Sequence, residues 1–69
     1  MKLSVYQDNV LMAKTESIHK ACQMAKDFSQ TSPIVQVKDN SKNVIVDYQN
    51  GKSTILDRVK YMKYRSKDA

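Results

Sequence analysis

The chain has 69 residues, 28% of them charged, with a single cysteine and a net charge of +5. At this length it forms one domain with a small core, and a deep cofactor pocket would take volume from that core, so we expect no enzyme. No run approaches the roughly 20 apolar residues of a membrane span, and a single cysteine that cannot form an internal disulfide indicates a reducing, cytoplasmic setting.

The first 14 residues predict a hairpin. Residues 2–6 alternate so that Leu3 and Val5 share a face, and residues 10–13 form a second short apolar run. The sequence QDN at 7–9 between them favours a turn, because Asp and Asn tolerate left-handed backbone.

Residues 17–30, SIHKACQMAKDFSQ, have a clear helical period. Five apolar residues fall on one stripe: Ile18, Ala21, Cys22, Ala25 and Phe28. Residues 15–17 offer hydroxyl groups that could cap the first turn, and Pro33 ends the helix before it. We therefore expect an amphipathic helix whose stripe packs on a sheet.

A second hairpin is predicted by two β-branched runs, 34–37 and 44–48, separated by the turn-forming residues 39–43. Val35 and Val37 should face the helix. The second run presents either Val44, Val46 and Tyr48 or else Ile45 to the core, and the pattern leaves this choice open.

The pair Asn50-Gly51 follows this hairpin and predicts a further two-residue turn, because both positions accept positive φ. It favours a fifth strand over residues 52–56, with Asp57 capping a short C-terminal helix. The alternative is a helix that begins at Thr54 and places its apolar residues at helical spacing.

These elements define an α+β fold: a small single domain with a ββαββ-type antiparallel sheet and one amphipathic helix packed on one face. We expect residues 1–56 to form the core domain and residues 57–69 a basic C-terminal tail or short helix. The strand order stays open. The uncovered face of the sheet should carry polar side chains: Ser4, Tyr6, Gln36 and Lys38.

The positive charge is concentrated near the C-terminus. Residues 1–51 carry a net charge of +1 and residues 52–69 a net charge of +4. Cations at this density neutralise phosphates, and interleaved tyrosines stack on unpaired bases. The candidate nucleic-acid-binding residues are Lys52, Arg58, Lys60, Tyr61, Lys63, Tyr64, Arg65 and Lys67.

The opposing interpretation is a solvated C-terminus in which Val59 and Met62 close the core. A helical wheel does not collect the charges on one side, which argues against a preformed recognition helix. Elsewhere, the single histidine, His19, has no partners at ligand spacing, and Cys22 lies on the apolar stripe. We expect no catalytic site, no metal site and no cofactor.

Two functional hypotheses follow. The first is a small, basic, non-enzymatic accessory or regulatory factor that binds DNA or RNA in a salt-sensitive way through its C-terminal segment. The second is a protein-interaction module, such as a phage- or plasmid-type inhibitor or adaptor of a host protein, that uses a sheet edge or the open sheet face. Edge strands could also pair in a homodimer.

Overall fold

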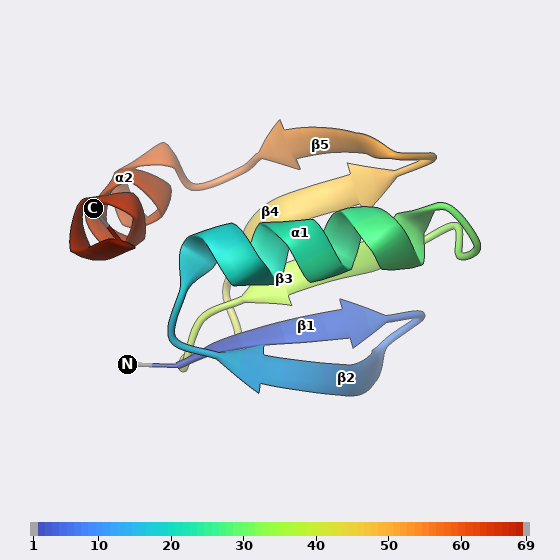
Figure 1. The fold of residues 1–69 in the computed structure, drawn as a ribbon, viewed down its shortest axis with the longest axis horizontal. Helices are drawn as coiled ribbons and strands as arrows, with labels where there is room; N and C mark the ends of the chain where they lie inside the picture. Colours follow the sequence, from blue (N-terminus) through green and yellow to red (C-terminus); the bar gives the residue numbers. More distant parts are fainter. Residues whose placement is uncertain (1, 69) are drawn as a thin grey trace.

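The computed structural model describes residues 2–68, in which five strands form one antiparallel sheet and two helices pack against it (Figure 1). The elements in chain order are β1 Leu3–Gln7, β2 Val10–Thr15, α1 Ile18–Ser29, β3 Val35–Lys38, β4 Val44–Gln49, β5 Lys52–Ile55 and α2 Arg58–Asp68. The α+β fold predicted from the sequence is confirmed. Of the predicted segments 1–56 and 57–69, residues 1 and 69 lie outside the described residues.

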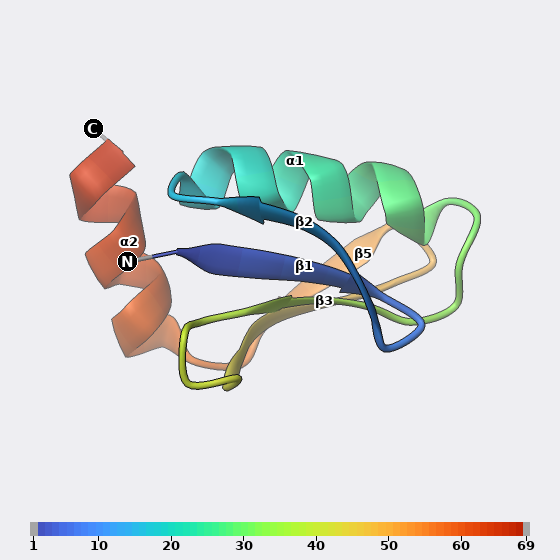
Figure 2. The same cartoon turned by 90° about the horizontal axis from the view of Figure 1, so that it is seen from below.

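The strands lie in the order β2-β1-β3-β4-β5, and every neighbouring pair is antiparallel. β3 enters the sheet beside β1, which brings the two predicted hairpins together at the centre. α1 covers one face, and the opposite face is open (Figure 2). α2 crosses the end of the sheet at which β1 begins (Figures 1 and 2).

The stripe on α1 forms the upper layer of the core. Ile18, Ala21 and Ala25 are buried, and Cys22 and Phe28 are partly buried against the same cluster. The lower layer includes the inward side chains of the adjacent strands β1 and β3: Leu3, Val5, Val35 and Val37. The helix begins as predicted, because the Ser17 hydroxyl accepts a hydrogen bond from the Lys20 N–H at 3.2 Å.

Two tight turns have the backbone that their residues favour. Asp8 and Asn9 have φ values of 51° and 67°, and Asn50 and Gly51 have φ values of 54° and 79°. Positive φ at both central positions matches the twist of the flanking strands, so each pair sets the register of its hairpin. The strand predicted after Gly51 is therefore formed.

The strand β4 resolves the open choice of face by means of a bulge. The register between β3 and β4 shifts after Val37, and this leaves Ile45 as an extra residue in β4. Alternation is interrupted there, so Ile45, Val46 and Tyr48 are all buried. Strict alternation offered either Val44, Val46 and Tyr48 or else Ile45, so it could not predict that members of both sets are buried.

The same bulge organises the connection from β5 to α2. The Ile45 carbonyl accepts hydrogen bonds from the Leu56 N–H at 2.8 Å and the Asp57 N–H at 3.3 Å. The Asp57 carboxylate then accepts from the Lys60 N–H at 3.0 Å and caps α2, as predicted. The alternative of a helix from Thr54 is wrong, because Thr54 pairs with Asp47 in the sheet.

The side of α2 that faces the core is not the one that carries Val59 and Met62, which the opposing interpretation placed in the core. Val59 is 80% exposed and Met62 is 57% exposed, so neither closes the core. Instead Tyr64 is only 6% exposed and Tyr61 packs partly against the core cluster. The cap at Asp57 fixes where the helix starts, and that start turns the tyrosines inward.

Candidate nucleic-acid interface

The loop between β3 and β4, residues 39–43, is held in one conformation by Asp39. One carboxylate oxygen, Oδ1, accepts hydrogen bonds from the Ser41 and Asn43 N–H groups, each at 2.9 Å. The Asp39 backbone adds a bond from its N–H to the Asn43 carbonyl and accepts one from the Lys42 N–H, both at 3.0 Å. Lys42 adopts a φ of 64° within this loop. The carboxylate thus supplies acceptors that the short turn lacks.

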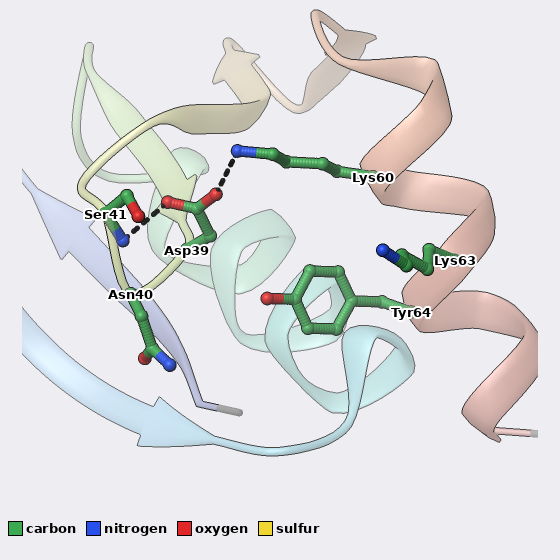
Figure 3. Close-up of a pocket in the computed structure, with 6 residues that line it drawn as sticks. All are labelled: Asp39, Asn40, Ser41, Lys60, Lys63 and Tyr64. Carbon is green, nitrogen blue, oxygen red and sulfur yellow. Dashed lines mark hydrogen bonds and ion pairs between the residues drawn. The ribbon is translucent and has the colours of Figure 1, made fainter.

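The second carboxylate oxygen of Asp39 ties the loop to α2. Lys60 Nζ lies 2.6 Å from Asp39 Oδ2 (Figure 3). This hydrogen bond holds the pKa of the Asp39 carboxyl below its ordinary value, against the opposing effect of burial. It also raises the pKa of Lys60. Both groups are therefore charged at neutral pH, and the ammonium of Lys60 is already neutralised by a partner.

Two hollows lie on either side of this loop. The helix-side hollow, of about 230 Å³, is lined by Asp39, Asn40, Ser41, Lys60, Lys63 and Tyr64 (Figure 3). The sheet-side hollow, of about 210 Å³, is lined by Lys2, Ser4, Tyr6, Leu11, Lys14, Asp39, Asn40 and Lys42. The shared residues Asp39 and Asn40 separate them, so the two hollows border one another along the loop.

The linings of both hollows are positively charged. Four lysines surround the loop in addition to Lys60, and we call them the basic end: Lys2, Lys14, Lys42 and Lys63. The one carboxylate in these two linings is Asp39, and its charge is balanced by Lys60. Lysines therefore outnumber carboxylates in these two linings, and positive charge gathered in this way attracts anions.

The residues predicted from the C-terminal segment are divided by the fold. Lys63 lines the helix-side hollow, and three other cations are exposed on α2: Arg58, Arg65 and Lys67. Lys52 lies on β5 beside the turn at the opposite end of the sheet from α2 (Figure 1). Lys52 lines a separate hollow at that turn, together with the carboxylate-bearing residue Asp47. Tyr64 is buried and Tyr61 is partly buried, so their rings serve the packing of α2.

Three residues of the basic end were not among the predicted site residues: Lys2, Lys14 and Lys42. They come from a part of the chain whose net charge is only +1, and therefore the charge distribution along the sequence conceals them. The placement of β1 beside both β2 and β3 brings them to one end of the open face. Strand alternation did indicate their neighbours Ser4, Tyr6 and Lys38.

The remaining candidate side chains line neither hollow. His19 is exposed on α1, and Cys22 is partly buried in the core. Burial, together with a hydrogen bond to Cys22, raises the pKa of Tyr48 above its ordinary value, so that phenol stays neutral. Among residues 2–68, no group of three or more His, Cys, Asp or Glu side chains is arranged to hold a metal ion.

Comparison of the chain with protein-family models, with curated proteins and with solved structures finds no match. Within the described part of the chain, both helices are too short and too polar to cross a membrane.

Proposed function

We propose that the protein is a small, non-enzymatic nucleic-acid-binding factor whose interface is the basic end. The observation that carries the proposal is the convergence of Lys2, Lys14, Lys42 and Lys63 on one loop. Lysines repel one another, so a cluster drawn from four separate segments with one neutralised carboxylate favours an anionic ligand. The exposed cations Arg58, Arg65 and Lys67 of α2 extend the positive surface along the backbone of a longer ligand.

Binding of nucleic acid through the basic end should weaken with salt in a defined way. Each phosphate neutralised on a single strand contributes about −0.7 to the slope of log affinity against log salt. Four lysines engaging four phosphates therefore give a slope near −3, and further contacts by α2 make it steeper. The binding should be fast, tolerant of sequence and weak above physiological salt.

Fluorescence anisotropy with labelled DNA and RNA, single-stranded and duplex, tests the proposal across a salt series. The variant Lys14→Glu with Lys63→Glu reverses two charges of the basic end. The matched control, Lys20→Glu with Lys26→Glu, makes the same charge change on exposed positions of α1, across the sheet from the open face. We expect at least a tenfold loss for the first variant and a much smaller loss for the control.

Equal losses in the two variants would show that net charge alone causes binding, and the basic end would not be the interface. An absence of binding by the wild-type chain at low salt would overturn the proposed function. Far-UV circular dichroism of each variant verifies that the sheet is intact.

A second candidate function, protein interaction, is favoured by the edge strand β2. Three consecutive apolar residues of this strand, Val10, Leu11 and Met12, are 44–59% exposed. Sheet edges in soluble proteins are usually short or charged, and the other edge, β5, is a strand of four residues that begins with Lys52. A partner strand could pair with β2, either from a host protein or from a second copy in a homodimer.

Analytical ultracentrifugation of the wild type and of Met12→Lys tests the homodimer. A dimer that the lysine abolishes supports pairing through β2, whereas a monomer at all concentrations removes the homodimer from consideration. We also propose a cytoplasmic location for the protein. The single cysteine supports it, because one cysteine cannot form an internal disulfide.

A further inference from the structure

The open face of the sheet carries a row of side chains that crosses the edge strand β2 and the two strands next to it, β1 and β3. Tyr6 of β1 is paired with Leu11 of β2 on one side and with Gln36 of β3 on the other. Residues directly opposite in an antiparallel sheet project to the same face, so these three side chains are neighbours. An aromatic ring, an exposed aliphatic side chain and an amide thus lie side by side next to the basic end.

The Tyr6 ring is covered by a side chain that can leave. Lys38 Nζ lies over the ring, 4.4 Å from its centroid. A cation–π contact at an exposed site is weaker than the stacking of a nucleic-acid base on an aromatic ring. An incoming base can therefore displace the lysine, and the freed ammonium can turn to a phosphate.

We propose that the ligand of this surface is single-stranded nucleic acid, with one base stacked on Tyr6 beside Leu11. This inference rests on the proposed function and names its ligand class. Gln36 can hydrogen-bond the edge of the stacked base, and Lys14 and Lys42, which line the same hollow as Tyr6, can neutralise phosphates of adjacent nucleotides. A duplex does not fit the same contacts, because its bases are stacked on one another and are not offered to a shallow hollow on a sheet.

The chain contains no tryptophan, so Tyr6→Trp introduces a single fluorescent indole at the proposed stacking position. We expect its emission to be quenched by an unstructured single strand and to change little with a fully paired hairpin of the same composition. A strand of equal length with abasic sites keeps the phosphates and removes the bases, and it should not quench. The matched control is Phe28→Trp on α1, on the covered side of the sheet, where no ligand should quench.

Affinity provides the second measurement. Tyr6→Leu keeps an apolar side chain and removes the ring, and we expect a loss of about fivefold or more for the single strand. The wild type should lose a similar factor when the base-bearing strand is replaced with the abasic strand. Tyr6→Leu should then bind the abasic strand about as well as the wild type does, since the stacking is absent in both cases.

Equal quenching by the base-bearing and abasic strands would overturn the inference, as would tighter binding of the duplex than of the single strand. If Tyr6→Leu binds the single strand like the wild type while Lys14→Glu with Lys63→Glu does not, stacking on Tyr6 is wrong and the proposed function stands. If the wild type binds no nucleic acid at low salt, both proposals fail.

Discussion

Replacement of Asp39 with alanine should destabilise the fold through one loop. The carboxylate accepts from the Ser41 and Asn43 N–H groups, each at 2.9 Å. Two backbone donors in a partly buried loop lose their acceptor in Asp39→Ala, at about 1 kcal/mol each. The lost contact with Lys60 contributes little to stability, because the Lys60 side chain is 36% exposed and ion pairs at such positions are weak.

The free energy of unfolding should therefore fall by about 2 kcal/mol, which lowers the melting temperature of a domain of this size by roughly 8–16 °C. Urea unfolding followed by far-UV circular dichroism measures the difference. Asp39→Asn keeps a side-chain oxygen in place for both N–H groups and should cost less than about 1 kcal/mol.

The matched control is Asp27→Ala, which removes a carboxylate from an exposed position on α1 and should change stability by no more than about 0.5 kcal/mol. If Asp39→Ala is as stable as this control, the hydrogen bonds of the loop do not stabilise the fold and the reasoning is refuted. If Asp39→Asn is as damaging as Asp39→Ala, the charge on the carboxylate is the important property, and the assignment of separate roles to its two oxygens is wrong.

Three further predictions concern stability. The pKa of Asp39 is lowered in the folded protein, so the stability that its carboxylate contributes is present above the unfolded pKa of about 3.9 and is lost as the pH falls through the folded pKa. Urea unfolding from pH 5 to pH 2 should therefore show a smaller acid-induced loss of the free energy of unfolding in Asp39→Asn than in the wild type. Parallel curves for the two proteins would contradict this. Tyr64→Ala should lower the free energy of unfolding by about 3–4 kcal/mol because Tyr64 is only 6% exposed. Met62→Ala on the same helix should be nearly neutral, because Met62 is 57% exposed. Equal effects of the two changes would mean that α2 does not stabilise the core. Gly51→Ala should cost about 1 kcal/mol from its φ of 79° alone, because no atom lies within 4 Å of the added Cβ; a loss several times larger would indicate a steric conflict that the turn does not show.

The parts of the fold that could be predicted from the sequence are those that local patterns determine. The stripe on α1 and the pairs Asp8-Asn9 and Asn50-Gly51 each involve neighbours in the chain, and each formed as predicted. The bulge at Ile45 could not be predicted, because it depends on how β4 is matched to β3 and on the carbonyl that it turns towards Asp57. Local alternation carries no information about that match.

The side of α2 that faces the core could not be predicted from the local sequence either. A helical wheel of its sequence does not collect the charges on one side. The nucleic-acid hypothesis makes both tyrosines ligand contacts, whereas the opposing interpretation assigns Val59 and Met62 to the core. The structure exposes Val59 and buries Tyr64. A local feature, the cap at Asp57, sets the start of the helix. A tertiary feature, the contact of Lys60 with a loop 21 positions earlier in the chain, then favours the observed side, and the local sequence carries no information about it.

The two oxygens of Asp39 also explain why the proposed interface differs from a simple count of basic residues. One oxygen shapes the loop that separates the two hollows, and the other holds Lys60. The ammonium of Lys60 therefore attaches α2 to the loop. A phosphate could bind Lys60 only in competition with the Asp39 carboxylate, which lies 2.6 Å away. The same attachment places Lys63 at the helix-side hollow, next to the loop that it shares with the hollow lined by Lys2, Lys14 and Lys42. Lys60, predicted as a ligand contact, thus positions the proposed interface. Three of the four lysines of the basic end, Lys2, Lys14 and Lys42, lie outside the C-terminal segment in which the sequence concentrates its charge.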